Sequence, residues 1–186
     1  MRVIAGSAKR LPLKSPKGMD TRPTQDRIKE TLFNMIQNDI FGCTFLDLFA
    51  GSGGIGIEAL SRGAKEAYFI EKSKAVCSVI SENLQFTHLQ EHAMLMNQDV
   101  FSGLSRLITM PITFDIIFMD PPYNQKLEYK VLDMIKDSSL ISDDTLIIVE
   151  ASLETDFSYL TDMGYEMIKE KNYKTNKHLF IRKLSH

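Results

Sequence analysis

An α/β fold with a mostly parallel sheet is predicted from three features of the sequence. Short apolar runs typical of buried strands alternate along the chain with longer segments of helical periodicity, the order expected of strands joined by crossover helices. A glycine-rich turn follows the first of these runs, as in nucleotide-binding α/β sheets. The last two apolar segments are separated by only a short polar turn and should pair antiparallel. The predicted sheet is therefore Rossmann-like, with one antiparallel strand.

The predicted elements begin with a basic arm, whose short apolar stretches and punctuating Pro12, Pro16 and Gly18 favour a small hairpin. A helix capped by Thr24 or Asp26 follows and ends near residue 42. Beyond it the pattern predicts strand 45–49, helix 55–62, strand 66–71, helix 73–84, strand 93–98, helix 100–108, strand 114–119, helix 127–136, strand 145–151, helix 154–162 and strands 165–173 and 177–184. We expect the arm and its helix, residues 1–42, to pack on a core of residues 43–186, which makes the chain effectively one domain.

Length and composition are those of an ordinary globular protein, and 186 residues are enough for one domain with a sizeable core. No run approaches membrane length, and the N-terminus lacks the continuous apolar stretch of a secretion signal. We therefore expect a cytoplasmic protein with no membrane partner. Cys43 and Cys77 lie far apart and the four histidines form no recognisable cluster, so neither a metal site nor a disulfide is expected.

The net charge of -2 hides an uneven distribution of charge along the chain. Residues 1–29 carry a net charge of +6 and residues 169–183 carry +5, whereas residues 30–168 carry -13. A basic arm and a basic tail on an acidic body predict binding to a polyanion, although a solvated flexible arm would show the same composition. The candidate contacts in the arm are Lys9, Arg10, Lys14, Lys17, Arg22 and Arg27.

A glycine-rich turn links a predicted strand to a predicted helix at residues 47–56. Gly51, Gly53 and Gly56 fit the spacing G-x-G-x-x-G, in which glycine permits a tight left-handed path and lets a ligand approach backbone N–H groups. This spacing fits NAD as readily as S-adenosylmethionine (SAM), but Asp47 suits the cationic sulfonium and ammonium of SAM. The absence of Gly-Lys-Ser/Thr from the turn excludes a Walker phosphate loop. The candidate cofactor-binding residues here are Asp47, Phe49, Ala50, Gly51, Gly53 and Gly56.

Acidic residues end four successive predicted strands. After Asp47 comes Glu71, about 20 residues beyond the glycine turn, whose carboxylate could accept hydrogen bonds from both ribose hydroxyls of an adenosine. Asp99 could accept the adenine amino hydrogens, or it could simply cap the next helix. Asp120 ends the fourth strand. Because open α/β sheets bind ligands at the carboxyl ends of their strands, these residues predict one binding edge.

The fourth acid begins the sequence Asp120-Pro121-Pro122-Tyr123, directly after the apolar run 114–119. A nucleobase or amide nitrogen is a poor nucleophile because its lone pair is delocalised. Asp120 and the Pro121 carbonyl could hold the N–H hydrogens and free that lone pair for attack on an electrophilic methyl group. The prolines stiffen this acceptor geometry, and Tyr123 offers a face on which a flat base can stack. We therefore interpret Asp120, Pro121, Pro122 and Tyr123 as candidate catalytic residues.

Together these segments resemble the class I SAM-dependent methyltransferases, and within them the RsmD family of 16S rRNA guanine-N2 methyltransferases. The resemblance covers nearly the whole chain. The glycine turn and D-P-P-Y are shared by many amino-methylating enzymes, whereas the sequence R-P-T-x-D-R at residues 22–27 is much more specific to this family. The matching segments are residues 1–7, 21–27, 29–34, 47–56, 58–63 and 120–123.

The resemblance implies SAM as the methyl donor and the exocyclic N2 amine of one guanine in 16S rRNA as the acceptor. It also implies that the substrate is the small ribosomal subunit or a late assembly intermediate; we expect the protein to act as a monomer. Two departures from the family pattern lie in regions expected to face RNA. Arg10 stands where the family usually has a glycine after the lysine, and Tyr173-Lys174 replaces the usual Tyr-Gly.

Other functions fit parts of the same pattern. Another amino-methyltransferase could act on adenine N6 in DNA or on a glutamine amide (N5) in a protein, although DNA enzymes usually carry a target-recognition insert and this chain has little beyond the core. An NAD-dependent oxidoreductase would share the glycine turn, but no obvious acid or base for hydride transfer accompanies it. A catalytically idle RNA-binding module would bind RNA without a cofactor and transfer no methyl group.

Overall fold

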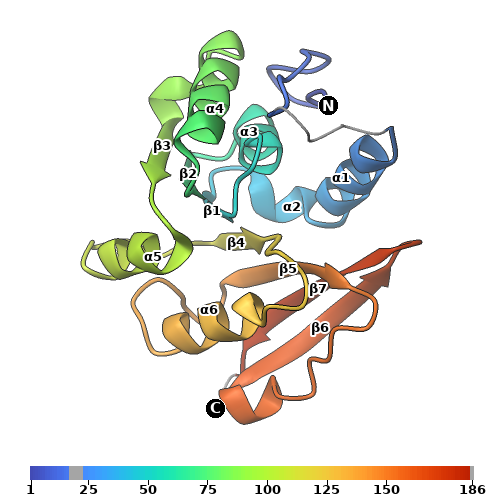
Figure 1. Ribbon diagram of the computed structural model, residues 1–186, viewed down its shortest axis with the longest axis vertical. Coiled ribbons are helices and arrows are strands. Elements are labelled where there is room, and N and C mark those ends of the chain that lie inside the picture. Colours follow the sequence, from blue (N-terminus) through green and yellow to red (C-terminus); the bar gives the residue numbers. More distant parts are fainter. Residues whose placement is uncertain (17–22, 185–186) are drawn as a thin grey trace. The chain divides into compact units, whose positions relative to one another are not determined.

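The protein is described by a computed structural model that covers residues 1–16 and 23–184 (Figure 1). The chain divides into two compact units, residues 1–100 and residues 101–186. The N-terminal arm and its helix therefore belong to the same unit as the glycine turn. Within the described residues, no helix is long and apolar enough to cross a membrane.

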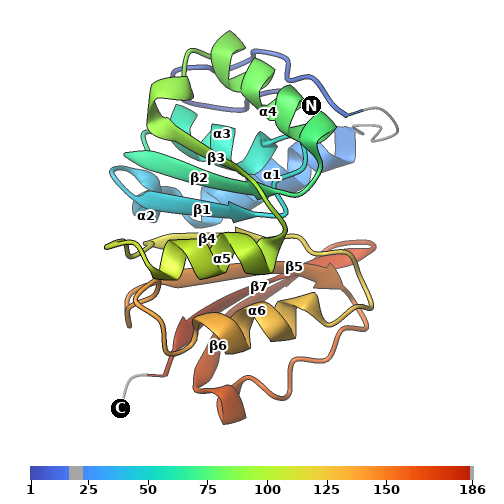
Figure 2. The same cartoon turned by 60° about the vertical axis from the view of Figure 1, so that its left-hand side comes forward.

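The first unit contains three parallel strands in the order β3-β2-β1. They are β1 (Thr44–Leu48), β2 (Glu66–Glu71) and β3 (Ala93–Asn97), and they are joined through α3 (Gly54–Ser61) and α4 (Lys74–Phe86). Because both crossovers step in the same direction along the sheet and parallel crossovers are right-handed, both helices lie on one face (Figure 2). All five elements lie within two residues of their predicted bounds.

Apolar side chains from both layers fill the core of this unit. Phe45 on β1 and Phe69 on β2 are fully buried, as are Ile57 on α3 and Ile80 on α4. Strands covered on both faces read as continuous apolar runs rather than alternating ones, which explains their strong sequence signal. Each such side chain contributes about 1.5–3 kcal/mol when it is fully buried.

The N-terminal segment combines a rudimentary hairpin with two helices. One antiparallel bridge joins Arg2 to Pro12, and the Val3 N–H donates to the Leu11 carbonyl at 3.0 Å. The predicted single helix to residue 42 is wrong in one respect, because it is broken at Ile36. The two pieces are α1 (Pro23–Met35), which begins on a proline as helices often do, and α2 (Gln37–Ile40).

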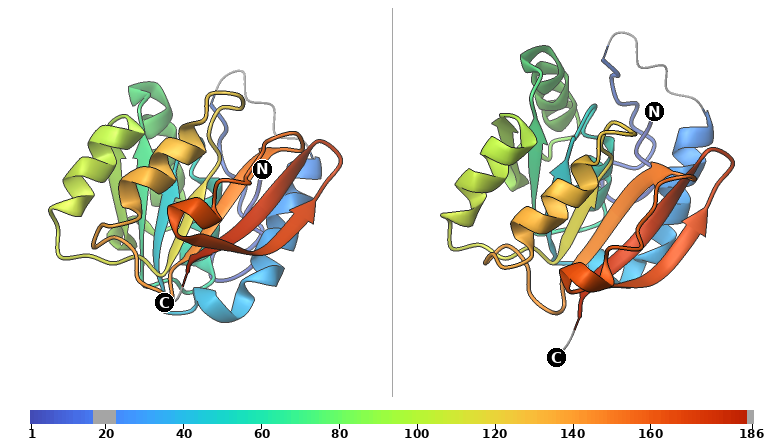
Figure 3. Two further views of the ribbon diagram at one scale, coloured as in Figure 1. Left: turned by 90° about the horizontal axis from the view of Figure 1, so that it is seen from below. Right: turned by 60° about the horizontal axis from the view of Figure 1, so that its bottom comes forward.

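The second unit contains the antiparallel strand that the sequence predicts. Strands β4 and β5 are parallel, and β7 runs antiparallel to both β5 and β6. Strands β6 and β7 form a long hairpin (Figure 3). The helix α5 leads into this unit from the end of the first. The bounds are α5 (Val100–Ile108), β4 (Ile116–Met119), α6 (Leu127–Ile135), β5 (Leu146–Ser152), β6 (Tyr165–Asn172) and β7 (Asn176–Lys183).

The predicted helix 154–162 does not form. Residues beyond β5 are irregular and end in one 3₁₀ turn, Thr161–Met163, before Gly164 at φ 83°. The Asp156 carboxylate accepts from the Ser158 N–H at 3.0 Å and from its hydroxyl at 2.8 Å. Such local bonds from a side chain to the backbone compete with helical hydrogen bonding, and here they replace it.

Candidate active site

The three glycines of the turn in the first unit meet two different demands. Gly51 (φ 55°) and Gly53 (φ 76°) are both left-handed, a conformation that costs other residues free energy. Gly56 has a packing role, because a Cβ atom there would lie 2.3 Å from the ring of Phe69. Phe49, also in the turn, is left-handed at φ 61° without being glycine. The glycines thus let the turn adopt left-handed conformations at Gly51 and Gly53 and pack closely against Phe69 at Gly56.

Asp47 lies beneath this turn, only 1% exposed. Its Oδ2 accepts from the Gly56 N–H at 2.9 Å, which satisfies one of the free N–H groups at the start of α3 and places negative charge at the positive end of the helix. Asp47 therefore fixes the helix to the strand. Its contact with a cationic cofactor stays a prediction.

Glu71, the last residue of β2, lies beside the glycine turn as predicted from the spacing. Its Oε2 accepts from the Gly51 N–H at 3.2 Å, and its Oε1 accepts from the Ser73 N–H at 2.8 Å. The side chain is only partly buried, and an ionised carboxylate accepts more than two hydrogen bonds. A Cβ atom on Gly51 would meet only the Phe49 carbonyl, at 3.9 Å, so the space above the turn is open. The Glu71 carboxylate can accept hydrogen bonds from hydroxyl groups, and the backbone beside it is open to a ligand. This arrangement fits the ribose of SAM.

Asp99 lies two residues beyond the end of β3 and is exposed. The last residue of that strand is Asn97, which the sequence analysis does not single out. Its Nδ2 donates to the carbonyls of Glu71 at 3.1 Å and Lys72 at 3.0 Å. Asn97 thus ties the ends of β2 and β3 together, which steadies the backbone of Glu71.

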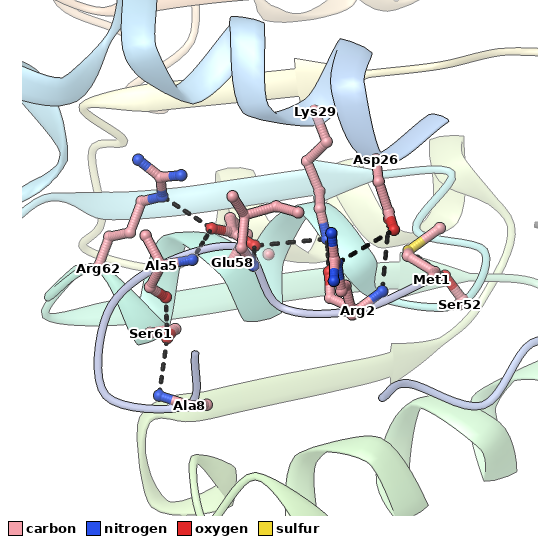
Figure 4. A network of polar contacts seen from close by, with 12 residues as sticks. Met1, Arg2, Ala5, Ala8, Asp26, Lys29, Ser52, Glu58, Ser61 and Arg62 are labelled. Carbon is pink, nitrogen blue, oxygen red and sulfur yellow. Dashed lines mark hydrogen bonds and ion pairs between the residues drawn. The ribbon is translucent and has the colours of Figure 1, made fainter. Parts of the chain in front are cut away.

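The basic arm is docked on α3 through a buried carboxylate (Figure 4). Glu58 is fully buried and accepts from the backbone N–H groups of Ile4 at 2.8 Å and Ala5 at 3.0 Å. Arg62 Nε lies 2.8 Å and Lys29 Nζ 3.4 Å from the same carboxylate. Burial lowers the pKa of Lys29, and the nearby Glu58 opposes that shift. The arm therefore supplies donors to a charge that water cannot reach.

Ser61 of α3 and Asn83 of α4 also hold the arm in place. The Ser61 hydroxyl donates to the Ala5 carbonyl at 2.6 Å, and a Cβ atom on Gly6 would lie 1.7 Å from the Ser61 carbonyl oxygen. Asn83, a buried residue of α4, bonds both backbone groups of Lys14, at 2.8 and 3.0 Å, and donates to the Ser52 carbonyl at 3.0 Å. One side chain thus connects the arm to the glycine turn.

Ion pairs already occupy several of the basic residues counted in the arm. Arg2 Nε lies 3.8 Å from Asp26, and Lys14 Nζ lies 2.6 Å from Glu82. Together with the buried Lys29, these cations have partners within the protein. The basic segment is therefore less free to bind a polyanion than its composition indicates.

Three of the predicted contacts remain exposed and have no ion-pair partner within residues 1–16 and 23–184: Lys9, Arg10 and Arg27. Arg10 has φ 72°, in the region that favours glycine, which gives a physical reason for the glycine that the family usually has there. Lys174, the other departure, has no positive φ. Lys17 and Arg22 lie outside the described residues.

In the second unit, Asp120 directly follows β4, and Pro121 behind it is buried. Tyr123 keeps 42% of its surface exposed, so its ring is open to a stacking partner. The pKa of Asp120 is raised to about 8, first by desolvation of the carboxyl group and then by the charge of Glu150. The side chain nevertheless keeps surface open to water, and this solvent screening weakens both effects. Burial also raises the pKa of Tyr123.

Neither Glu150 nor His178 was predicted from the sequence as a site residue. Glu150 lies in β5 after the apolar run 146–149, just as Asp120 follows β4, so the same strand-end pattern could have identified it. Its Oε2 lies 3.0 Å from His178 Nε2, and His178 Nδ1 lies 3.2 Å from the Tyr173 hydroxyl. His178 is therefore part of a buried polar cluster that spacing along the chain did not reveal.

Comparisons with known proteins agree with this geometry. The family model described as Conserved hypothetical protein 95 matches residues 1–182. Ribosomal RNA small subunit methyltransferase D of Haemophilus influenzae is 37% identical over 174 residues, which cover 92% of this chain and 88% of the relative. The solved structure of yhhF from Escherichia coli has a TM-score of 0.83 at 30% identity and covers 100% of this chain and 99% of that one.

A more distant solved structure shares the fold. The SAM-dependent methyltransferase from Agrobacterium tumefaciens has a TM-score of 0.65 at 16% identity and covers 89% of this chain and 63% of that one. The chain therefore belongs to the family of ribosomal RNA small subunit methyltransferase D, and the predictions of this family, of the fold class, of a methyltransferase and of SAM as its cofactor are confirmed.

Proposed function

We propose that this protein transfers a methyl group from SAM to the N2 amine of one guanine in 16S rRNA, within the small ribosomal subunit or a late assembly intermediate, and acts as a monomer. The observation that carries the proposal is the position of Asp120-Pro121-Pro122-Tyr123 at the end of β4, with a carboxylate and an exposed aromatic ring presented together. The H. influenzae relative, a small-subunit rRNA methyltransferase by name, supports the same substrate class.

The second unit holds the groups that would receive the base. Asp120 and the Pro121 carbonyl accept the two hydrogens of the exocyclic amine, which leaves the nitrogen lone pair directed at the methyl group. Neither proline has an N–H, and each fixes its own φ, so these acceptors move little. Tyr123 stacks on the flipped guanine and holds its plane.

The first unit holds the groups that would bind the cofactor, which supplies an electrophilic methyl group on a cationic sulfur. Glu71 accepts hydrogen bonds from the ribose hydroxyls, and the open backbone at Gly51 lets the ligand approach. Asp99 accepts from the adenine amine, and Asp47 contributes negative charge beneath the turn. Phe49, Ala50 and Gly53 complete the proposed cofactor-binding surface.

Replacing Glu71 with alanine should weaken SAM binding more than it slows methyl transfer at saturation. The variant loses the charged hydrogen bonds to ribose, each worth about 1.5–3 kcal/mol at most, and it also releases the Gly51 N–H. We expect Kd, measured by calorimetry, to rise roughly 10- to 100-fold. Glu66→Ala, at the opposite end of the same strand, is the matched control and should leave Kd unchanged. Equal affinities for wild type and Glu71→Ala would remove Glu71 from the cofactor site.

The exposed end of the arm should contribute RNA affinity through its charge. Replacing Lys9 and Arg10 together by alanine removes two free cations, whereas Lys14 is already paired with Glu82. Each lost phosphate contact flattens the log-log dependence of affinity on salt by about 0.7–0.9, so the double variant should lower the slope by about 1.4–1.8. Lys65→Ala combined with Lys130→Ala removes the same charge from other exposed sites and should keep the wild-type slope. An arm with no RNA role would give one slope for all three proteins.

Transfer of labelled methyl groups to a panel of substrates tests the proposed function. The panel is undermethylated small ribosomal subunits, large subunits, duplex DNA and a protein with an exposed glutamine loop. We expect incorporation only into small subunits, and only when SAM is the donor. Labelling of DNA or protein in preference to small subunits would favour the other amino-methyltransferases, and no labelling at all would favour an idle RNA-binding module.

A further inference from the structure

Polar residues form one row across three neighbouring strands of the second unit. Met119 of β4 is paired in parallel register with Val149 of β5, so the next residues, Asp120 and Glu150, stand side by side at the strand ends. Glu150 is in turn the direct partner of His178 on β7. Directly paired residues of neighbouring strands lie on the same face of a sheet. The row therefore runs from Asp120 through Glu150 to His178 on one face.

Two donors hold the middle member of this row. Glu150 Oε1 accepts from Asn176 Nδ2 at 2.5 Å, and Oε2 lies 3.0 Å from Nε2 of His178, which is 1% exposed. Burial raises the pKa of Tyr173 to about 12, so its hydroxyl stays protonated and donates to His178 Nδ1. This assignment leaves the proton on Nε2, where it is donated to Glu150. The two contacts fix both carboxylate oxygens of Glu150 in place.

We propose that Glu150 is a positioning residue of the acceptor site: anchored by His178 and Asn176, it holds a fixed negative charge beside Asp120, so that Asp120 takes up the proton which the target amine releases. The inference rests on the proposed function, because it takes Asp120 as the residue that contacts the amine. Glu150 itself acts only through Asp120.

The proton balance of the step follows from this arrangement. The N2 lone pair forms a bond to the methyl carbon, the carbon–sulfur bond breaks, and its electron pair goes to sulfur. One N2 proton then moves to the Asp120 carboxylate and leaves to solvent across the open surface of that side chain. Two adjacent carboxylates disfavour a second negative charge, and the one without strong donors becomes the more basic. The upward pKa shift of Asp120 agrees with this assignment.

The row and the loops beside it contribute four titratable groups besides Asp120. Tyr123 lies three residues on in the same loop, Glu150 comes from β5, His178 from β7, and Tyr173 from the turn between β6 and β7. Of these groups, Glu150 is the one whose charge raises the pKa of Asp120. Its removal should therefore be visible as a change in the titration of Asp120.

The test compares Glu150→Gln with wild type by the pH profile of kcat at saturating SAM and by the carboxyl carbon NMR titration of Asp120 in the free protein. We expect the acidic limb of the profile and the NMR midpoint to move together to lower pH by at least one unit, with a lower maximal kcat. Glu150→Asp keeps the charge and should keep the limb near its wild-type position. Glu166→Gln, an exposed glutamate of β6, removes the same charge elsewhere and should behave as wild type.

Two outcomes separate this inference from the function on which it rests. If Asp120→Ala abolishes transfer but Glu150→Gln keeps the wild-type limb and NMR midpoint, Glu150 has no positioning role and the inference is overturned. If Asp120→Ala itself keeps wild-type turnover, the proposed acceptor site fails. SAM affinity and thermal unfolding of Glu150→Gln identify a folding defect, and the NMR midpoint of the folded fraction still decides the case.

Discussion

Asp120→Ala should lower kcat about 100- to 1000-fold while SAM affinity stays within twofold of wild type. The side chain proposed to hold and deprotonate the amine is lost, and removal of one preorganised group at a reacting centre typically costs about 2.7–4 kcal/mol. The cofactor groups Glu71 and Asp47 belong to the other unit and are unchanged. Single-turnover transfer to small ribosomal subunits measures the first quantity, and calorimetry the second. Wild-type turnover in this variant would refute the proposed role.

The same residue should oppose folding at neutral pH. The pKa of the Asp120 carboxyl group is raised in the folded state. As pH rises from about 4, this group therefore loses its proton more readily in the unfolded chain than in the folded protein. The folded state becomes relatively less stable until the pH passes about 8. Asp120→Asn removes this dependence and should raise Tm at pH 8 but not at pH 4. Because the side chain is exposed to solvent, we expect a gain of about 1 kcal/mol, or roughly 2–4 °C. A larger gain at pH 4 than at pH 8 would show that the shift has the opposite sign.

Gly6→Ala should be among the most destabilising single substitutions in the arm. The new methyl group would lie 1.7 Å from the Ser61 carbonyl oxygen, which is backbone and cannot rotate away, and Gly6 has φ 83°. The arm must then leave α3 and withdraw the Ile4 and Ala5 N–H groups from the buried Glu58. We expect a loss of about 3 kcal/mol, which lowers Tm on the order of 6–12 °C.

Gly164→Ala is the matched control for this prediction. Gly164 has the same φ of 83°, but no heavy atom lies within 4 Å of the added Cβ. It should lose only the conformational preference of glycine, about 1 kcal/mol. The difference between the two variants in chemical denaturation isolates the contact with Ser61. Equal losses would mean that the arm is not held against α3.

The fold around the cofactor turn was predictable because its signals are local. Strands buried on both faces read as apolar runs, and glycine spacing reports backbone demands that the structure confirms at Gly51 and Gly53. The segment 154–162 was mispredicted because the Ser158 N–H and hydroxyl both donate to the Asp156 carboxylate, a local interaction that apolar periodicity does not reveal. Single turn-forming residues thus decided what the wider pattern did not.

The parts of the site that depend on contacts between distant segments were not predictable. From the sequence, Lys29 and Arg62 would be taken for surface charges, yet both form ion pairs with the buried Glu58. Asn83 likewise bonds to Lys14, almost 70 residues away in the arm. The cluster of Glu150 and His178 likewise depends on the register of β5 against β7. Such pairs become visible only when strands and helices are placed side by side.

Nucleoside mass spectrometry of 16S rRNA identifies the atom that this protein methylates. Small subunits from a strain lacking this protein are incubated with purified protein and SAM, and the rRNA is digested to nucleosides. We expect about one N2-methylguanosine gained per 16S rRNA, and none with Asp120→Ala. Methyl groups found only on adenine N6, or on another atom of guanine, would contradict the proposed amine acceptor and with it the role given to Asp120.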